Sequence, residues 1–290
     1  MKQVLIVGPN SYLGSSLGAY LARFPERYRV RTLSVRDGGW KETPLGGFDA
    51  IYYTAALVHR EQAKNDPSQA ERYNEINAVL PAAVAKKAKA EGVRQFVFLS
   101  TMAVYGLTAP YGKTVTITAQ TPLCPTDYYG QSKAKAEQAL LALEDDSFRV
   151  AILRPPMIYG KGCKGNYQAL RAFAQKMPCF PKIGNGRSML YVGNLNRLVQ
   201  LLLDSGEGGI FCPQDGEYVD TGRMVQAIAR AQGRSLPLIP GFGWALSLLR
   251  HASPKIDKAF GSLRYDQTLS SFSQDYRVFS WEQAVRESEA

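Results

Sequence analysis

A tyrosine and a lysine lie four residues apart in the segment Tyr129-Gly-Gln-Ser-Lys133, which opens a run of helical composition. Four residues is slightly more than one helical turn, so the phenol and the ammonium share one face of the predicted helix. A free tyrosine has a pKa of about 10, and a cation held beside it favours the phenolate. The spacing therefore predicts an acid/base tyrosine whose pKa Lys133 lowers toward the neutral range. Taken alone, the two residues also fit an exposed tyrosine beside a surface lysine.

Strands and helices alternate on both sides of this pair. Short apolar runs predict buried strands, and the segments between them carry apolar residues at helical spacing. Because the strands are continuously apolar, they indicate a parallel sheet with helices on both faces. The expected fold class is therefore α/β, a doubly wound sheet of the Rossmann type. The strands are predicted at Val4–Val7, Val30–Val35, Ala50–Ala56, Gln95–Ser100 and Arg149–Leu153, and the helices at Tyr12–Phe24, at Asn74–Glu91 and from Tyr129.

The chain changes texture after Pro155-Pro156, where irregular stretches with Gly and Pro alternate with short helical patterns. This change predicts a smaller C-terminal α/β domain over the carboxyl edge of the sheet, where open α/β folds bind ligands. We expect residues 1–158, with a return segment at about 188–214, to form the first domain, and residues 159–290 most of the second. The segment Gly241–Gly261 is expected to be a helix of the second domain rather than a helix at a membrane.

A glycine-containing loop joins the first strand to the first helix, with the sequence Gly8-Pro-Asn-Ser-Tyr-Leu-Gly14. Small residues at such a turn let the backbone approach a pyrophosphate, and the helix N-terminus then faces the phosphates. Ser11 stands where the common G-x-x-G-x-x-G pattern has its middle glycine. The loop predicts that the first domain binds a dinucleotide, with contacts from Gly8, Asn10, Ser11, Tyr12, Leu13 and Gly14.

The end of the second strand should contact the adenosine ribose of that dinucleotide. An acid at this place accepts the 2′-hydroxyl of NAD, whereas an arginine accommodates the 2′-phosphate of NADP. Ser34 occupies the place of the acid and Arg36 follows it, so the sequence leans toward NADP. Two alternatives stay open: Asp37 turned inward would favour NAD, and Arg36 also fits an ordinary loop arginine.

Charge and cysteine content narrow the function classes. The 290 residues carry a formal net charge of +10, but the basic residues are spread along the chain. That distribution indicates attraction of a small anionic ligand rather than nucleic-acid binding. Four scattered cysteines and two histidines argue against a zinc site or a disulfide scaffold, and for reduced thiols in a cytoplasm. No apolar run could span a bilayer and no signal peptide is expected, so we predict a cytoplasmic protein.

Three motifs together give a resemblance to a known family. The nucleotide loop is followed by LSTMAVYG (Leu99–Gly106), expected as a strand, and by YYGQSK around Tyr129. In this order and spacing they resemble the extended short-chain dehydrogenases/reductases. The closest likeness is to the NAD-dependent epimerases and dehydratases of nucleotide sugars, including UDP-glucose 4-epimerases and 4-ketoreductases. The resemblance implies an enzyme and covers nearly the whole chain.

The resemblance assigns roles to residues that match the family motifs. Thr101 matches the hydroxyl residue that contacts substrate, Tyr129 the acid/base, and Lys133 the residue that binds the nicotinamide ribose. Asn77 matches an asparagine that supports the site. Further residues fall where family members line the dinucleotide, namely Thr54, Ala55, Ala56, Ser100 and, in the segment Arg154–Gly160, Pro156.

Two later residues match positions that bind the substrate in the family. Asn166 resembles the asparagine that contacts a sugar-nucleotide diphosphate, and Arg187 resembles the arginine that pairs with the same group. An arginine fork facing a diphosphate is chemically sound. Read without the family, Asn166 fits a loop turn and Arg187 a surface charge. Met102 and Ala103 stand where sugar-nucleotide dehydratases have Asp-Glu, so the resemblance disfavours dehydration.

These observations predict oxidoreduction at C4 of a UDP-hexose with NAD or NADP. The first expectation is a UDP-sugar 4-epimerase for cell-surface polysaccharide precursors, and the second is an NADPH-dependent 4-ketoreductase of a nucleotide deoxy-sugar. A small-ketone reductase and a non-catalytic dinucleotide sensor are further alternatives. The family also implies a homodimer through the helices at Asn74–Glu91 and Tyr129–Leu143, with no metal and no nucleic-acid partner.

Overall fold

The computed structural model describes residues 1–58, 66–241, 243, 247–248 and 255–290. The chain forms two compact units. Unit 1 comprises Met1–Gly106, Pro122–Arg154 and Asn196–Cys212, and unit 2 comprises Leu107–Thr121, Pro155–Leu195 and Pro213–Ala290. The segment Leu107–Thr121, expected in the first domain, belongs to unit 2. Most of the segment Gly241–Gly261 lies outside the described residues.

Unit 1 is built on a six-stranded sheet with the order β10-β6-β4-β3-β1-β2. All five strand pairings in it are parallel. The predicted doubly wound α/β sheet is therefore confirmed. Its apolar runs are buried, and the last four residues of β1 are inaccessible to solvent or nearly so. The strands are β1 (Lys2–Val7), β2 (Tyr28–Leu33), β3 (Ala50–Tyr53), β4 (Gln95–Leu99), β6 (Arg149–Leu153) and β10 (Gly209–Phe211).

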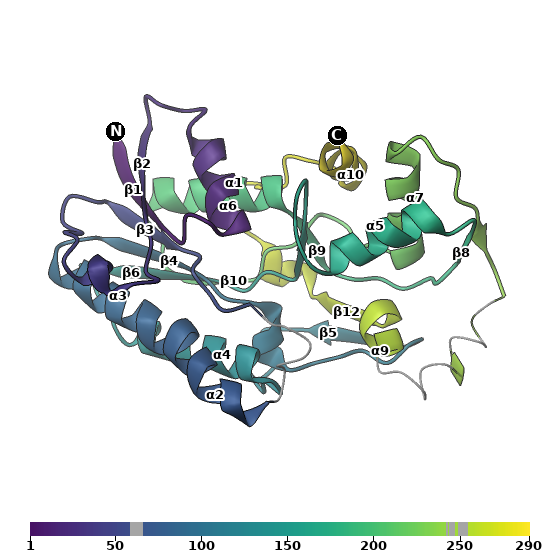
Figure 1. Ribbon diagram of the computed structural model, residues 1–290, viewed down its shortest axis with the longest axis horizontal. Coiled ribbons are helices and arrows are strands. Elements are labelled where there is room, and N and C mark those ends of the chain that lie inside the picture. The colour runs from purple at the N-terminus through teal and green to yellow at the C-terminus, as the bar shows by residue number, and fades with distance from the viewer. Residues whose placement is uncertain (59–65, 242, 244–246, 249–254) are drawn as a thin grey trace. The chain divides into compact units, whose positions relative to one another are not determined.

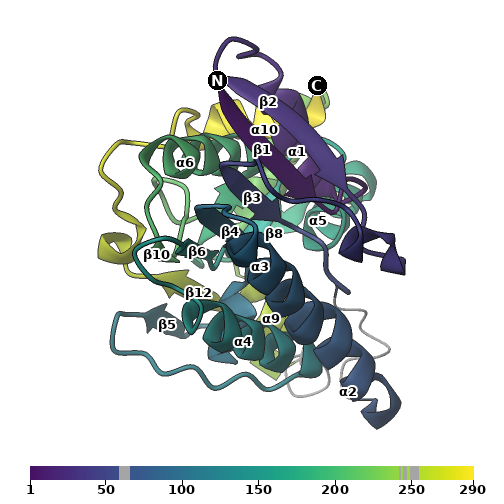
Figure 2. The same ribbon diagram turned by 90° about the vertical axis from the view of Figure 1, so that its left-hand side faces the viewer.

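Helices cover both faces of this sheet. In two perpendicular views α1 (Tyr12–Leu21) and α6 (Val192–Ser205) lie on one face (Figures 1 and 2). The same views place α3 (Leu80–Ala90) and α4 (Tyr128–Leu141) on the other face. The core of the second face contains rings from the central strands and from the loop before β6, among them Tyr53, Phe96, Phe98 and Phe148.

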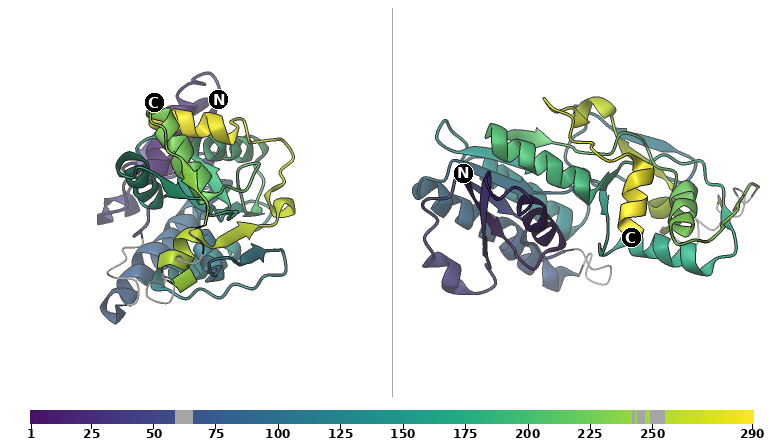
Figure 3. Two further views of the ribbon diagram at one scale, coloured as in Figure 1. Left: turned by 90° about the vertical axis from the view of Figure 1, so that its right-hand side faces the viewer. Right: turned by 90° about the horizontal axis from the view of Figure 1, so that it is seen from above.

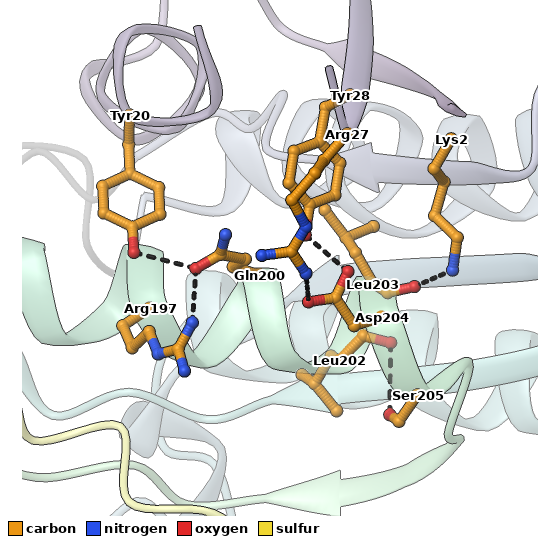
Figure 4. Close-up of polar contacts among 10 residues, drawn as sticks. All are labelled: Lys2, Tyr20, Arg27, Tyr28, Arg197, Gln200, Leu202, Leu203, Asp204 and Ser205. Atoms are coloured by element: carbon orange, nitrogen blue, oxygen red, sulfur yellow. Dashed lines mark hydrogen bonds and ion pairs between the residues drawn. The ribbon is translucent and has the colours of Figure 1, made fainter. Parts of the chain in front are cut away.

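Polar contacts attach α6 to the N-terminal part of unit 1 (Figure 4). Gln200 Oε1 accepts hydrogen bonds from Tyr20 OH at 2.9 Å and from Arg197 Nη1 at 2.7 Å. Asp204 forms an ion pair with Arg27 at 2.7 Å and also accepts the hydroxyl of Tyr28. These contacts join α6 to residues nearly two hundred positions earlier in the sequence. The segment Asn196–Cys212 thereby completes the first unit.

The helix predicted over Asn74–Glu91 is interrupted. It consists of α2 (Pro67–Asn74), a π-helical turn η3 (Glu75–Val79) and α3. Pro81 has no N–H to donate to the carbonyl four residues earlier, and the preceding Leu80 N–H instead reaches the carbonyl of Glu75. The predicted helix is therefore present, with a π-helical turn in its first part.

The strand predicted over Leu99–Gly106 was also wrong. The strand β4 ends at Leu99, and Met102–Tyr105 forms a 3₁₀ helix, η4. The Thr101 hydroxyl accepts the N–H of Ala103 at 3.2 Å and caps this turn, which ends at Gly106 in the left-handed region with φ 64°. Threonine favours such local side-chain caps over continuing a strand. A second short 3₁₀ helix, η1 (Gly38–Lys41), lies in the predicted loop 37–47.

Unit 2 consists of short elements around its own aromatic core. The ring of Tyr159 packs against Tyr167 and Tyr191 with centroid separations of 5.7 Å in both cases. The helix α10 lies beside α7 in two views (Figure 3). The described elements of this unit are β5 (Thr114–Ile117), β7 (Met157–Tyr159), α5 (Asn166–Lys176), β8 (Phe180–Pro181), β9 (Met189–Tyr191), α7 (Thr221–Ala231), β11 (Leu238–Ile239), α9 (Lys255–Phe260), β12 (Ser262–Tyr265), η5 (Gln267–Ser270) and α10 (Trp281–Glu289).

Within the described ranges, none of the helices combines the length and the apolar character that crossing a bilayer requires.

Candidate active site

The loop after β1 has the close backbone approach that a dinucleotide site needs. Gly8 has φ +100°, and a Cβ there would lie 2.7 Å from the Ala55 N. Ser11 caps α1 by accepting the N–H of Gly14 at 2.9 Å, and its hydroxyl lies 2.6 Å from that of Thr54. Loop, helix start and the end of β3 are therefore held together. Because the side chain of Ser11 is engaged in the cap, an anion here would meet backbone N–H groups at the helix N-terminus.

The other predicted residues of this loop sit around the same turn. Asn10 is exposed, whereas Tyr12 and Leu13 are half-buried in the first turn of α1. Ala56 is half-buried after β3. The structure thus brings the predicted residues of the loop and of the end of β3 to one place. A side chain at Gly8 would collide with the Ala55 backbone and the Thr54 hydroxyl, so only glycine lets the loop pack this closely on the end of β3. A tight glycine turn before a helix N-terminus is what a dinucleotide pyrophosphate requires, so these residues fit a dinucleotide.

The end of β2 lies next to this loop, since the Gly8 N–H donates to the Leu33 carbonyl at 3.0 Å. Arg36 is exposed, and its N–H donates to the Ser34 hydroxyl at 3.4 Å. Asp37 caps η1 by accepting the N–H of Gly39 at 3.2 Å. The carboxylate that could have contacted a ribose is therefore bound to its own helix.

The helix α4 presents Tyr129 in its first turn. Asp127 caps the helix by accepting the N–H of Gly130 at 2.8 Å. A Cβ on Gly130 would lie 2.7 Å from the Ala103 carbonyl oxygen, so only glycine lets α4 pack this closely on η4. This contact brings the residue before η4, Thr101, into a side-chain hydrogen bond with Tyr129. Two hydroxyls from separate elements thus converge.

The pKa of Tyr129 moves in the direction opposite to the prediction. Burial raises it to about 12, the charge of Asp127 adds to the rise, and the hydrogen bond from Thr101 opposes it. Lys133 is not among the groups that shift it. The prediction that Lys133 lowers the pKa of this tyrosine was wrong for the protein as it stands, because the ammonium is engaged elsewhere. At neutral pH Tyr129 carries its proton.

Lys133 is almost fully buried one turn further along α4, with 2% of its surface exposed. Its Nζ donates to the Leu99 carbonyl at 2.8 Å and lies 4.5 Å from the centre of the Phe98 ring. Burial lowers its pKa to about 7, and the carboxylate of Glu137 opposes that shift. The alternative of an exposed surface lysine is excluded.

Asn77 is fully buried in the π-helical turn and links two parts of unit 1. Its Oδ1 accepts the Leu57 N–H at 2.8 Å, and its Nδ2 donates to the Leu57 carbonyl at 3.0 Å. Nδ2 also contacts the Ser132 hydroxyl at 3.1 Å, which in turn donates to the Tyr129 carbonyl at 2.8 Å. Asn77 therefore fixes the loop after β3 relative to the first turn of α4.

Sequence reasoning missed a group of buried charged residues next to the end of β4. Glu137, Arg154 and Tyr105 are buried and hydrogen-bonded to one another through the guanidinium of Arg154. The hydroxyl of Ser100, assigned above to the dinucleotide, donates to Glu137. The available signal was the spacing of Lys133 and Glu137, which places both on one face of α4.

Three predicted residues belong to unit 2. Pro156 is buried just before β7, and Asn166 is the exposed first residue of α5. Arg187 is half-buried, its backbone bridges to Val219, and its Nη1 donates to the Gly261 carbonyl at 3.1 Å. Burial lowers the pKa of Arg187 from its ordinary value. Within this unit Asn166 is thus exposed to solvent, whereas Arg187 is half-buried and hydrogen-bonded to the backbone.

A parallel α/β sheet, a glycine loop at a helix N-terminus and a Tyr-x-x-x-Lys helix beside a threonine define a short-chain dehydrogenase/reductase-type enzyme. The model of the NAD dependent epimerase/dehydratase family matches residues 4–207, and the chain belongs to that family. A UDP-glucose 4-epimerase from Vibrio cholerae is 28% identical over 293 residues, which cover 91% of this chain and 87% of that protein.

Solved structures share the fold over the whole length. A UDP-glucuronic acid 4-epimerase from Bacillus cereus in complex with NAD has a TM-score of 0.74 at 15% identity, covering 99% of this chain and 97% of that one. A dTDP-4-dehydrorhamnose reductase from Bacillus anthracis in complex with NADP has a TM-score of 0.72 at 19% identity, covering 99% of both chains. The chain is therefore an enzyme of the nucleotide-sugar epimerase/reductase type.

Proposed function

We propose that this protein catalyses oxidoreduction at C4 of a UDP-hexose, and that it is a UDP-sugar 4-epimerase. The observation that carries the proposal is the convergence of the Tyr129 and Thr101 hydroxyls at the start of α4. The likeness to the Vibrio cholerae UDP-glucose 4-epimerase supports the choice of reaction. Met102 and Ala103 lie in η4 without a side chain that transfers protons, which argues against dehydration.

Tyr129 and Thr101 divide the proton chemistry in this proposal. A bound nicotinamide dinucleotide would accept the hydride from C4 and return it to the opposite face. Thr101 hydrogen-bonds the C4 oxygen and orients it, and Tyr129 exchanges a proton with that oxygen. Asn166 and Arg187 are proposed to contact the diphosphate of the substrate. The Gly8–Gly14 loop would hold the cofactor pyrophosphate, and Lys133 the ribose beside the nicotinamide.

A second function, NADPH-dependent reduction of a 4-keto nucleotide sugar, is favoured by two observations. Tyr129 carries its proton in this structure, which suits delivery of a proton to a keto oxygen. Of the two charged residues after β2, Asp37 uses its carboxylate to cap η1, whereas the side chain of Arg36 is exposed. An arginine at this place suits the 2′-phosphate, so we propose NADP as the preferred cofactor.

Incubation with UDP-galactose distinguishes the two functions. Formation of UDP-glucose without net consumption of NADPH is the result expected for the epimerase. Oxidation of NADPH in the presence of a 4-keto nucleotide sugar, with no conversion of UDP-galactose, would assign the reductase instead. Parallel cofactor titrations should give a lower Kd for NADP than for NAD, and Arg36→Ala should remove that difference while Lys41→Ala, on η1, should preserve it.

We further propose that the enzyme acts as a homodimer in the cytoplasm and supplies precursors of cell-surface polysaccharides. The helices α3 and α4 would form the dimer interface, as the family resemblance implies. Light scattering coupled to size-exclusion chromatography measures the mass directly. A monomer mass at micromolar concentration would contradict the dimer.

A further inference from the structure

A buried carboxylate lies one turn beyond Lys133 on the same face of α4. Glu137 has 1% of its surface exposed, and Arg154, directly after β6, has 7%. Arg154 Nε lies 3.1 Å from both carboxylate oxygens, and its Nη2 lies 2.5 Å from Oε2. Such a bidentate pair is among the strongest hydrogen-bonded contacts between side chains.

Two further side chains complete this cluster. The hydroxyl of Ser100, the residue after β4, donates to Glu137 Oε1. Arg154 Nη1 donates to the Tyr105 hydroxyl at 2.9 Å, and its guanidinium lies 5.3 Å from the centre of that ring. The cluster therefore ties the carboxyl ends of β4 and β6 to α4 and η4. Leu99, whose carbonyl accepts the ammonium of Lys133, directly precedes Ser100.

Burying a charged pair in the core is costly unless every partner is satisfied, and an apolar pair of the same volume often stabilises a protein as well. The hydrophobic core alone does not require these charges. What needs explanation is that this pair joins α4, one turn beyond the buried Lys133, to the end of β6.

We infer that Glu137 is a positioning residue: its carboxylate, fixed by Arg154 and Ser100, holds the Lys133 ammonium on the Leu99 carbonyl, one turn of α4 beyond Tyr129. The inference rests on the proposed function only in taking Lys133 to act in catalysis. Glu137 touches neither substrate nor cofactor in this role and acts through the lysine.

The charges around Lys133 support this role. Glu137 is the group that raises the pKa of Lys133 against the effect of burial. Among the described residues, the other titratable side chains of the cluster are Arg154 after β6, Tyr105 on η4 and Cys212, whose thiol lies 3.7 Å from the Tyr105 hydroxyl. Tyr129 lies on α4 itself. Without the negative charge, burial acts unopposed and the lysine loses its proton at lower pH.

The test follows the titration of Lys133 by NMR in protein labelled with ¹³C at the lysine ε-carbon, without cofactor or substrate. The signal is assigned by its absence in Lys133→Arg. In Glu137→Gln we expect the titration midpoint to fall by about one pH unit or more. In assays of the enzyme the loss of rate at high pH should begin at correspondingly lower pH, because the ammonium is lost earlier.

Glu137→Gln leaves Arg154 unpaired in the core, so the double variant Glu137→Gln/Arg154→Met is measured beside it. The double variant has no unpaired buried charge. The inference requires a fall in the midpoint there too, smaller than in the single variant because the positive charge of Arg154 is also removed. Glu91→Gln is the matched control, since Glu91, the C-cap of α3, pairs with Lys87 at the same spacing. It should leave the midpoint of Lys133 unchanged.

An unchanged midpoint in the folded single or double variant overturns the inference. Because the titration needs no turnover, that result is independent of which reaction the enzyme catalyses. Absence of any C4 oxidoreduction would instead overturn the proposed function and leave the titration result standing.

Discussion

The pKa values of the two residues in the Tyr-x-x-x-Lys pair are shifted in opposite directions. Burial raises the pKa of Tyr129 and lowers that of Lys133, and each shift is opposed by one specific neighbour, Thr101 for the tyrosine and Glu137 for the lysine. A cofactor cation near the phenol would act in the same direction as Thr101. The acid/base chemistry is therefore set by neighbours that lie outside the motif itself.

Replacing Tyr129 by phenylalanine should remove the proton transfer while keeping the ring. We expect kcat to fall by roughly 10²–10⁴-fold, the range for loss of a general acid–base group. Tyr128→Phe is the matched control, because it removes a hydroxyl from the adjacent residue of α4. Equal losses in the two variants would contradict the role of Tyr129.

Lys133 should make the stability of the fold depend on pH. Its pKa falls from 10.5 to about 7 in the folded protein, so between those values the unfolded chain binds the extra proton. The free energy of unfolding should therefore rise with pH across this window, by ~2 kcal/mol between neutral pH and two units above it. Urea unfolding at both pH values checks this, and Lys133→Met should lose that part of the rise. A variant with the same pH dependence as the parent would contradict it.

At the scale of elements, the close contact of α4 with η4 sets the geometry of the site. The absence of a side chain on Gly130 brings the helix onto the Ala103 carbonyl, and the Thr101 cap turns the chain after β4. Each element supplies one of the two hydroxyls, so neither element forms the site by itself. The geometry depends on a helix start and a 3₁₀ turn fitting against each other.

Gly130→Ala should separate these two elements. The new Cβ would lie 2.7 Å from a backbone oxygen, so α4 must shift, and we expect a loss of about 1–3 kcal/mol in unfolding free energy together with a large loss of activity. Gly18→Ala in α1 is the control, since its Cβ would meet only Ile6 Cδ1 at 3.7 Å. That variant should gain up to ~1 kcal/mol from helix propensity. Thermal unfolding of both proteins measures the difference.

The sequence predicted the sheet well and the turns around the site poorly. Apolar runs as short as Val4–Val7, ended by a glycine, favour buried strands over helices, so the parallel sheet followed from the sequence pattern. The turn after Leu99 did not, because a threonine cap competes with strand continuation through one local hydrogen bond. Nor did the Glu137–Arg154 pair, since its partners come from separate elements that only the folded sheet brings together. Local patterns encode elements, whereas the site depends on their packing.

At the scale of the whole molecule, the net charge of +10 should affect the capture of an anionic substrate. The attraction acts over roughly 10 Å at moderate ionic strength and is screened by added salt. We expect kcat/KM for a UDP-sugar to fall several-fold as NaCl is raised from low to near-molar concentration, with kcat changing much less. Steady-state kinetics across a salt series, with potassium acetate as a second salt, measures this. A kcat/KM independent of both salts would contradict it.

The completion of the first unit by residues 196–212 has a consequence for synthesis on the ribosome. The strand β6 lacks its outer neighbour, and one sheet face lacks α6, until that segment has emerged. A growing chain therefore carries an open strand edge and an uncovered apolar face while the first part of unit 2 is being made. A chain cut after residue 158 should accumulate as aggregates, whereas one cut after residue 212 should remain dispersed, as sedimentation of lysates would measure. Early nascent chains of this enzyme are thus expected to be clients of chaperones.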